Sequence, residues 1–275
     1  MGCDFLLYSY YSPGCKRAEN AKLYSYYSLY SYYRPYNLYT LIMIKNIIFD
    51  LGGVLLDIDL PFCMRSMQAL GIDLNTLPQP ASAKEDADMK PAVMGEGVVA
   101  SGMLHQYQIG TVSTPDFLSA VHSLCTPGIT MQQVADAWNT CCIDIPQYRL
   151  DKVRQLRDKG YRIYMLSNTN DAHWQDIVAR CFGGQKAVDD LFDHTFLSQE
   201  MHMAKPNDDI YTSVLKVIGA PANECLFIDD STPNVEAARA LGFHTIHADV
   251  SSTRDGKVIA PPATDWTDII DSALC

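Results

Sequence analysis

From residue 147 onward, short apolar runs alternate with longer segments whose apolar residues recur every three or four positions. Apolar runs rich in β-branched residues predict strands buried on both faces, and the longer segments predict helices. The predicted strands cover residues 161–166, 194–197, 224–228 and 243–247, and the predicted helices cover 146–159, 171–182, 206–218 and 235–241, with a polar tail after residue 247. Such alternation is typical of a parallel sheet covered by helices, which predicts an α/β fold with a doubly wound parallel sheet.

Another apolar run, residues 45–49, precedes this region and predicts the first strand of the same sheet. It is followed directly by Asp50 and then by Gly52 and Gly53. Parallel sheets bind ligands at the carboxyl ends of their strands, because the loops there surround a crevice. Asp50 is therefore a candidate functional residue, and the two glycines allow the backbone to approach whatever it binds. The alternative interpretation is a turn after the strand with a solvated Asp.

The segment between these two regions carries apolar side chains mainly at helical spacing. Predicted helices cover residues 60–70, 95–108, 115–124 and 131–141, and a loop rich in Pro, Ala and charge covers 74–91. Ser113 or Thr114, followed by Pro115, is a typical helix start. Because the block is too long for an ordinary crossover, we predict a helical domain of residues 60–145 inserted into an α/β core of residues 43–59 and 146–275.

The first 42 residues differ from the rest of the chain. The sequence Leu7–Ser12 recurs at residues 23–28 and, truncated, at 29–33, so most tyrosines lie in a Tyr- and Ser-rich repeat. Such a low-complexity segment has few aliphatic residues for a core, and it lacks the basic region and cleavage site of a signal peptide. We expect residues 1–42 to be a disordered tail or an upstream extension of the reading frame, with Met43 as the natural start. An adhesive Tyr-rich segment is the alternative.

Polar side chains follow the predicted strands at positions that a doubly wound sheet brings to one edge. They are Asp50, Ser167, Lys205, Asp229 and Asp230. Several carboxylates close together repel one another unless a cation lies among them. Carboxylate and carbonyl oxygens suit Mg²⁺, while Lys205 and Ser167 supply a positive charge and a hydroxyl for phosphoryl oxygens. This set leaves Asp50 as a carboxylate nucleophile directed at phosphorus.

Charge and cysteine content restrict the partners and the compartment. The formal net charge of -11 and the lack of a basic stripe argue against nucleic acid and anionic membranes as partners. The nine cysteines form no CxxC pair and no zinc-like spacing with His, which indicates reduced, mostly buried thiols. We therefore expect a cytoplasmic protein, monomeric or homodimeric, that binds a small phosphorylated metabolite.

Four short motifs make the chain resemble the haloacid dehalogenase (HAD) superfamily of phosphatases. The motifs are Phe49–Val54, Leu166–Asn170, Ala204–Pro206 and Phe227–Ser231. Together they span about residues 43 to 250, in the order and structural context that the superfamily has. Four motifs together are specific evidence for the resemblance, whereas one alone would be weak evidence. The resemblance implies a Rossmann-like core with the helical block as a C1-type cap. Within the superfamily the chain is most similar to small sugar-phosphate phosphatases, including α-D-glucose-1-phosphate phosphatase.

The resemblance implies a role for each matching residue. Asp50 would attack phosphorus to form an aspartyl phosphate, which water then hydrolyses. Asp50, the Gly52 carbonyl and Asp230 would bind Mg²⁺ directly, and Asp229 would bind it directly or through water. Lys205 would neutralise charge on the nucleophile and the phosphoryl group.

Five further residues have assigned roles in or near the site. By the same resemblance, Ser167 and Asn168 would hold phosphoryl oxygens, and Asn234 would orient Lys205 or cap the following helix. His173 and Trp174 are candidates to face the substrate, although a His at a helix start is more often simply solvated.

One position departs from the superfamily pattern. Most of its phosphatases carry a second Asp two residues after the nucleophile as general acid and base, and Gly52 occupies that position here. Loss of such a group typically costs about 10² to 10⁴ in rate. The loss matters least for a good leaving group, which favours a hexose 1-phosphate as substrate. His105, Glu96 or a water chain are candidate replacements for the missing acid.

Two other classes of function remain open at this point. A dehalogenase also uses an Asp nucleophile without the second Asp, but it needs no metal, so the pair Asp229 and Asp230 argues against it. A catalytically weak protein that binds a phosphate ligand is compatible with Gly52.

Overall fold

In the computed structural model, the residues that can be described are 43–72, 93–94, 98–99 and 102–274. The predicted Tyr-rich extension, residues 1–42, lies outside them, and so does the predicted loop 74–91. Among the described helices, none has both the length and the apolar composition needed to cross a membrane.

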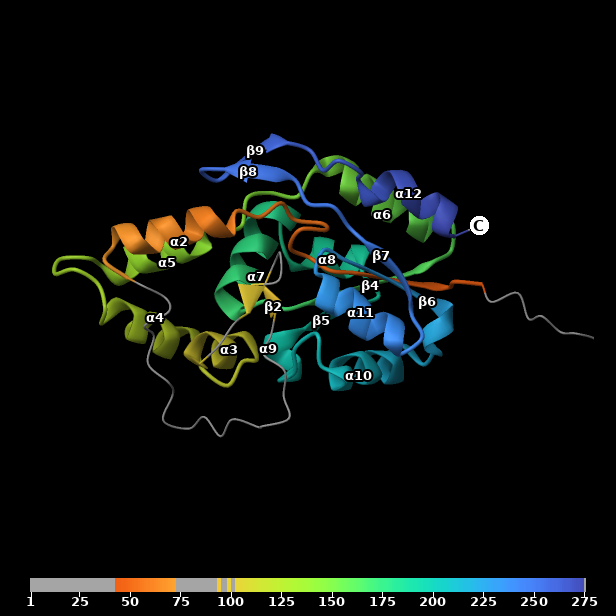
Figure 1. Ribbon diagram of the computed structural model, residues 1–275, viewed down its shortest axis with the longest axis horizontal. Coiled ribbons are helices and arrows are strands. Elements are labelled where there is room, and N and C mark those ends of the chain that lie inside the picture. Colours follow the sequence, from red (N-terminus) through yellow and green to blue (C-terminus); the bar gives the residue numbers. More distant parts are fainter. Residues whose placement is uncertain (1–42, 73–92, 95–97, 100–101, 275) are drawn as a thin grey trace, which may run out of the picture. The chain divides into compact units, whose positions relative to one another are not determined.

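A five-stranded parallel sheet, ordered β5-β4-β1-β6-β7, forms the centre of the α/β part (Figure 1). The strands are β1 (Asn46–Phe49), β4 (Arg162–Ser167), β5 (His194–Leu197), β6 (Cys225–Asp229) and β7 (His244–His247). In β1, Ile48 pairs with Tyr164 of β4 and with Phe227 of β6. The chain first fills one side of β1 and then the other, so the strand order reverses between β1 and β6, where such sheets bind ligands. The predicted doubly wound parallel sheet is confirmed.

Helices cover both faces of this sheet. They are α6 (Gln147–Asp158), α7 (Asp171–Ile177), α10 (Asp208–Ile218), α11 (Thr232–Ala240) and α12 (Trp266–Ala273). Because successive strand residues point to opposite faces, Phe49 packs in the core beneath α6, α7 and α12, while Ile48 packs in a second core beneath α10 and α11. Burial on both faces explains why the central strands β1 and β6 are mainly apolar.

The described part of the predicted inserted block contains four helices. They are α2 (Leu60–Ala69), α3 (Gly102–Gln108), α4 (Thr114–His122) and α5 (Met131–Asn139). Helix α5 packs against α2 and α4, and α3 packs against α4. The Ser113 side chain caps α4, and Thr130 with Gln133 forms a capping box at α5. Val134 of α5 belongs to the same apolar cluster as Phe49 of the sheet, so the helical block and the α/β part share one core.

The predicted polar tail is wrong. After β7 the chain forms a hairpin of β8 (Ser252–Arg254) and β9 (Lys257–Ala260) and then helix α12. Asp265 caps α12 by accepting a hydrogen bond from the backbone N–H of Thr267. Trp266 and Ile270, four residues apart, are buried in the core, so a short apolar stripe among polar residues was sufficient for a helix.

Other element boundaries differ from the predictions more modestly. The helix predicted over 95–108 begins at Gly102, and it is preceded by the two-residue antiparallel strands β2 (Val93–Met94) and β3 (Val98–Val99). The helix predicted over 171–182 consists of α7 and a π-helical turn, η2 (Val178–Phe182). Three short elements were not predicted: α8 (Gln185–Leu191), α9 (Ser198–Met201) and the 3₁₀ turn η3 (Ala222–Glu224).

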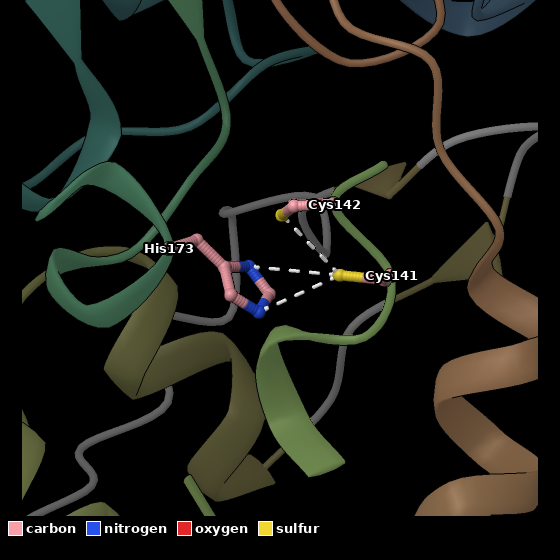
Figure 2. A group of neighbouring side chains, drawn as sticks. All are labelled: Cys141, Cys142 and His173. Atoms are coloured by element: carbon pink, nitrogen blue, oxygen red, sulfur yellow. Dashed lines mark hydrogen bonds between the residues drawn. The ribbon is translucent and has the colours of Figure 1, made fainter. Parts of the chain in front are cut away.

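The helical block meets the α/β part where the end of α5 contacts the start of α7. The imidazole of His173 stacks on the indole of Trp138, with 4.8 Å between ring centroids. Its Nε2 atom lies 3.0 Å from the Trp138 carbonyl oxygen. Cys141 and Cys142, which follow α5, point toward the same imidazole (Figure 2).

A buried arginine fixes the loop that follows Asp50. Arg149 of α6 is 1% exposed, and its Nη1 donates to the Asp57 carboxylate at 2.9 Å and to the Leu55 carbonyl at 3.3 Å. Its Nη2 lies 3.3 Å from Asp265 Oδ2 at the start of α12. A single guanidinium thus links the loop after β1 to two helices.

Replacing Arg149 by Leu should destabilise the fold strongly, because it leaves the buried Asp57 carboxylate without its charged partner. Breaking a buried pair in this way costs about 3–5 kcal/mol in the free energy of unfolding. The matched control is Arg154→Leu, which removes an exposed pair with Asp151 and should cost less than about 1 kcal/mol. Urea denaturation measures both values, and equal losses would contradict this interpretation.

Candidate active site

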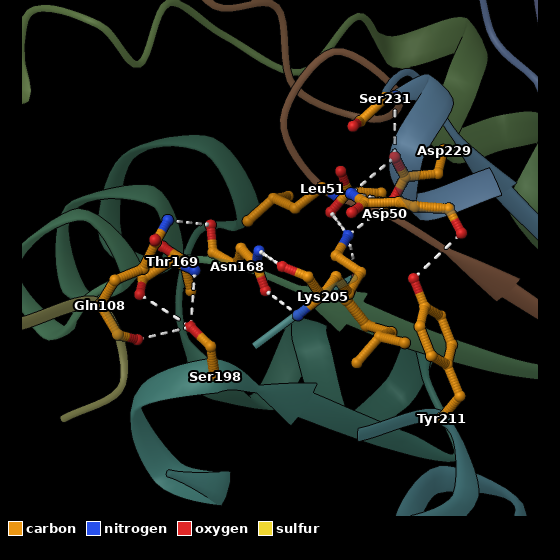
Figure 3. Close-up of polar contacts among 12 residues, drawn as sticks. Asp50, Leu51, Gln108, Asn168, Thr169, Ser198, Lys205, Tyr211, Asp229 and Ser231 are labelled. Carbon is orange, nitrogen blue, oxygen red and sulfur yellow. Dashed lines mark hydrogen bonds and ion pairs between the residues drawn. The ribbon is translucent and has the colours of Figure 1, made fainter. Parts of the chain in front are cut away.

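Asp50 lies at the end of β1 and is 7% exposed. Its backbone N–H donates to the Ile228 carbonyl at 2.8 Å, which continues the pairing of β1 with β6. Its Oδ1 atom accepts from the backbone N–H of Leu51 at 2.7 Å and lies 2.9 Å from Lys205 Nζ (Figure 3). Both donors contact Oδ1, which leaves Oδ2 for a further ligand.

Lys205 is fully buried between two carboxylates. Its Nζ lies 2.9 Å from Asp50 Oδ1 and 2.6 Å from Asp229 Oδ2, and it donates to the Leu166 carbonyl at 3.0 Å (Figure 3). Burial alone would lower the pKa of Lys205, but the attraction of Asp229 and Asp50 outweighs it and the pKa is raised. The lysine is therefore a permanent cation at the carboxyl ends of β1 and β6.

Asp229, the last residue of β6, is held from several directions. Its Oδ1 accepts from the backbone N–H of Ser231 at 2.8 Å and from Asn234 Nδ2 at 3.0 Å, while Oδ2 faces Lys205. Asn234 lies in the first turn of α11, and its amide orients Asp229, whereas the N-cap position of this helix belongs to Ser231. Asn234 thus binds Asp229, the acid that is paired with Lys205. The two roles predicted for it were to orient Lys205 and to cap the helix.

Asp230 differs from its neighbour because its Oδ2 atom is buried without a hydrogen-bond partner. Gly53 lies directly against this carboxylate: its backbone has a φ of +79°, and a Cβ built there would overlap Asp230 Oδ2. A side chain at position 53 is excluded by both the backbone conformation and the acid. A buried carboxylate oxygen without a donor is costly unless a cation or proton binds it.

The pKa values of two of these carboxyl groups are raised. Burial raises the pKa of Asp50 to about 7, with Lys205 opposing and Asp229 adding to the shift. Burial, followed by repulsion from Asp50 and Asp229, raises the pKa of Asp230 to about 8. These groups therefore hold protons in the cation-free protein that a bound cation would displace.

The three carboxylates fit a hard divalent cation. One oxygen from each of Asp50, Asp229 and Asp230 can be chosen so that all lie within 4.8 Å of one another. Carboxylate oxygens are the ligands that Mg²⁺ prefers, and the partnerless Oδ2 of Asp230 is the kind of atom that a cation satisfies. The three carboxylates of the predicted donor set therefore lie together in the fold.

Gly52 lines the cavity beside Asp50, as the position of the missing second acid should. A Cβ built on Gly52 would meet only Ile58, at 3.6 Å, which is ordinary van der Waals contact. Its φ angle lies outside the left-handed range, unlike that of Gly53. Position 52 can therefore accept a side chain, which makes a direct test of the missing acid feasible.

Ser167 and Asn168 lie at the end of β4 on the cavity wall. Asn168 accepts from the Lys205 backbone N–H at 2.9 Å and donates to the Lys205 carbonyl at 2.8 Å (Figure 3). Both amide atoms of the side chain thus hold the backbone of Lys205 in place. Ser167 is 2% exposed.

Residues at the strand ends and in the helical block line a cavity of about 110 Å³. Its lining includes Gln108 and Trp138, which the sequence interpretation missed. Gln108 ends α3, and its carbonyl accepts from Ser198 Oγ at 2.6 Å. A Cβ on the nearby Gly110 would overlap the Gln199 backbone, so a glycine is needed where the chain leaves α3. That glycine was the available sign in the sequence that the end of α3 lies against another segment.

The other residues proposed to face the substrate or to replace the missing acid differ in whether they line the cavity. His173 lines the cavity, and burial lowers its pKa to about 4, so its imidazole is neutral. Trp174 is buried against Phe182 in the core and is not among the cavity-lining residues. From α3, the described cavity lining contains Gln108 and not His105. Glu96 lies outside the described residues.

The chain is similar in sequence to known phosphatases. The curated D-ribitol-5-phosphate phosphatase of Bacteroides thetaiotaomicron is 29% identical over 204 residues, which cover 74% of this chain and 91% of that protein. The sesquiterpene phosphatase astK of Aspergillus oryzae is 27% identical over 152 residues, covering 54% of this chain and 74% of that protein.

Solved structures show the same relationship. A HAD family enzyme of Bacteroides thetaiotaomicron, in complex with magnesium and inorganic phosphate, is 32% identical with a TM-score of 0.63, over 76% of this chain and 96% of that one. A predicted HAD-like hydrolase of Porphyromonas gingivalis is 28% identical with a TM-score of 0.64, over 84% and 98%. Residues 44–242 match the family model of haloacid dehalogenase-like hydrolases. The resemblance seen in the four motifs is confirmed, and the chain belongs to the haloacid dehalogenase-like hydrolases.

Proposed function

We propose that this protein is a Mg²⁺-dependent phosphomonoesterase that hydrolyses a small phosphorylated metabolite through an aspartyl phosphate on Asp50. The observation that carries the proposal is the buried Lys205, whose Nζ lies 2.9 Å from Asp50 and 2.6 Å from Asp229. This contact holds Oδ1 of the nucleophile, so Oδ2 is the oxygen directed at phosphorus. The phosphatases of Bacteroides and Aspergillus that the chain resembles support the reaction class.

In the first step, a carboxylate oxygen of Asp50 forms a bond to phosphorus as the bond from phosphorus to the leaving oxygen breaks. The positive charge of Lys205 lowers the energy of the negative charge that gathers on the phosphoryl oxygens. The leaving alkoxide takes a proton from water, because position 52 provides no acid. A second water then attacks phosphorus as the bond from phosphorus to the Asp50 oxygen breaks, and its proton passes to the hydroxide left by the first water. Phosphate is released and the Asp50 carboxylate is restored.

Mg²⁺ would be held by Asp50, Asp230, the Gly52 carbonyl and Asp229, the last directly or through water. When bound, it supplies positive charge that binds the phosphoryl group and keeps the three carboxylates ionised. Asn234 and Lys205 both hold Asp229, so the protein itself fixes part of this site in advance. Ser167 stays a proposed contact of the phosphoryl oxygens. Asn168 stays one through its backbone N–H, because its side-chain amide binds the Lys205 backbone.

The dehalogenase alternative is less favoured by the site. A metal-independent hydrolysis would not need the buried pair of Asp229 and Asp230, and the partnerless oxygen of Asp230 would then be an uncompensated cost. A protein that only binds a phosphate ligand would keep the cavity and the cation site but not the turnover.

Substituting Asp50 by Asn should reduce hydrolysis of 4-nitrophenyl phosphate by at least about 10³-fold, because the amide cannot attack phosphorus. Removal of Mg²⁺ with a chelator should abolish the activity of the unmodified protein, and added Mg²⁺ should restore it. The matched control, Asp190→Asn on the exposed face of α8, should retain full activity.

Three results would each point elsewhere. Retention of a tenth of the activity in Asp50→Asn would rule out the covalent mechanism, and Mg²⁺-independent turnover of a halogenated acid would favour the dehalogenase. A protein that binds inorganic phosphate without turnover would be a sensor.

The preferred substrate, we propose, is a hexose 1-phosphate or a similar sugar phosphate with a good leaving group. Without an acid at Gly52, the barrier should depend steeply on the pKa of the departing hydroxyl, and an anomeric hydroxyl departs more easily than a primary one. The relative from Bacteroides is named for a substrate whose phosphate lies on a primary hydroxyl, so fit in the cavity competes with this chemical argument.

Measuring kcat/KM for glucose 1-phosphate, glucose 6-phosphate and D-ribitol 5-phosphate decides between the two. We expect the 1-phosphate to be hydrolysed most efficiently, and Gly52→Asp to raise the rate on the 6-phosphate more than on the 1-phosphate. An equal or larger value for either primary phosphate would contradict the proposal, and a uniform loss in Gly52→Asp would exclude the missing acid as the cause.

A further inference from the structure

Outside the carboxylate site, a second group of metal-ligating side chains lies on the wall of the same cavity. Cys141 and Cys142 follow α5, and His173 lies in the first turn of α7, 31 residues or more further along the chain (Figure 2). One ligand atom from each of the three residues can be chosen so that all lie within 4.8 Å of one another. All three residues line the cavity that also contains Asp50 and Lys205.

The spacing of these atoms suits a tetrahedral thiolate and imidazole site. With zinc bonds of about 2.3 Å to sulfur and about 2.0 Å to nitrogen, two sulfurs on one ion lie about 3.8 Å apart and a sulfur and a nitrogen about 3.5 Å apart. In the protein, the Sγ atoms of Cys141 and Cys142 are 3.6 Å apart. Cys141 Sγ lies 4.0 Å from His173 Nδ1, the nitrogen that the hydrogen bonds leave without a proton, which is about 0.5 Å more than the ideal separation. It lies 3.5 Å from Nε2.

The hydrogen bonds around His173 prepare one ring nitrogen for a cation. Asn170 Oδ1 accepts from the His173 backbone N–H and from the Trp138 indole, which orients its Nδ2 toward His173 Nδ1 at 3.0 Å. Nδ1 must then carry the lone pair, and Nε2–H donates to the Trp138 carbonyl at 3.0 Å. A ligating histidine usually donates its other N–H to a carbonyl or carboxylate in this way.

The burial of the imidazole keeps it in the form that a metal requires. His173 is neutral because burial lowers its pKa to about 4, so a cation has no proton to displace from Nδ1 near neutral pH. It must instead displace the contacts of Nδ1 with the Asn170 amide and the Cys141 thiol. The two sulfurs bind as thiolates, so each bond to a sulfur displaces a thiol proton to solvent.

The chemistry of this group separates it from the carboxylate site. Sulfur and imidazole ligands select soft or borderline cations such as Zn²⁺, whereas the oxygens of Asp50, Asp229 and Asp230 suit Mg²⁺. Three protein ligands are one fewer than a tetrahedral ion takes, and the cavity supplies the fourth position for water or a substrate atom.

We infer that Cys141, Cys142 and His173 form a binding site for Zn²⁺ on the wall of the active-site cavity, distinct from the carboxylate site. A zinc ion there stands within the space that a substrate enters. This effect rests on the function proposed above: a Zn²⁺ ion bound at this site excludes the substrate and slows its hydrolysis.

Direct binding can be measured without any turnover. The reduced full chain is saturated with Mg²⁺ to occupy the carboxylate site and is then titrated with Co²⁺, whose bonds to thiolates give charge-transfer absorption in the near ultraviolet. We expect one Co²⁺ per chain with this absorption, its displacement by Zn²⁺, and the release of thiol protons on binding.

Variants assign the site. Cys141→Ser and Cys142→Ser should each remove most of the absorption and weaken Zn²⁺ binding at least tenfold, and His173→Gln should weaken binding while the thiolate absorption persists. The matched control is Cys125→Ser, which alters a partly buried thiol of the helical block outside the group and should bind as the unmodified chain does. Circular dichroism verifies that each variant is folded. One folded variant among Cys141→Ser, Cys142→Ser and His173→Gln is sufficient to test the assignment of the site.

Two outcomes would overturn the inference. One is Co²⁺ binding without thiolate absorption in the unmodified chain, and the other is unchanged Zn²⁺ affinity in a folded cysteine variant.

In the Mg²⁺-saturated enzyme, a low concentration of Zn²⁺ should inhibit 4-nitrophenyl phosphate hydrolysis, and the Cys142→Ser variant should be at least tenfold less sensitive to Zn²⁺. Equal sensitivity would remove the inhibitory role, whereas a protein without phosphatase activity would still give the absorption if the site exists.

Discussion

The site depends on a surplus of buried negative charge at the carboxyl ends of β1 and β6. One carboxylate oxygen from each of Asp50, Asp229 and Asp230 lies within 4.8 Å of the others, and Lys205 contacts two of these acids. If all three acids are ionised, two negative charges remain uncompensated in a buried environment, which is unfavourable unless protons or a cation neutralise them. Burial is the main cause of the raised pKa values of Asp50 and Asp230, and the repulsion between the carboxylates adds to it. The surplus of charge also accounts for the affinity that the site should have for Mg²⁺ and for the phosphoryl group bound with it.

The rest of the fold holds this cluster in place. Asn168 binds the backbone of Lys205 with both atoms of its amide, and Asn234 binds the Asp229 carboxylate. Gly53 lets the loop after β1 pass directly against Asp230, and Arg149 fixes the far end of the same loop through Asp57. Because the cluster is buried and its members are held by neighbouring elements, the charges cannot relax apart, and a cation is the means of relieving them.

Local patterns predicted the sheet and its edge but not the contacts made by distant residues. Apolar runs ending in Asp50 and Asp229 identified the strands, because a strand buried on both faces has an unmistakable composition. Arg149 gave no such signal, since an arginine on a helix is normally solvated and only the fold brings two acids to it. The group of Cys141, Cys142 and His173 was equally hidden, because its members match no metal-binding spacing along the chain. Helix α12 was missed because its apolar stripe is short.

The stability of the protein as a function of pH, with and without Mg²⁺, tests the charge surplus most directly. In the unfolded chain both acids titrate near 3.8, whereas in the cation-free fold they titrate at about 7 and about 8. Between these values the fold binds more protons than the unfolded chain, so these two groups destabilise the cation-free protein as pH rises from about 4 to 8. Mg²⁺ displaces those protons, so the rise in melting temperature that it causes should be larger at pH 8 than at pH 6, and it should largely disappear in Asp230→Asn. A rise that is the same at both pH values, or unchanged in Asp230→Asn, would contradict the account.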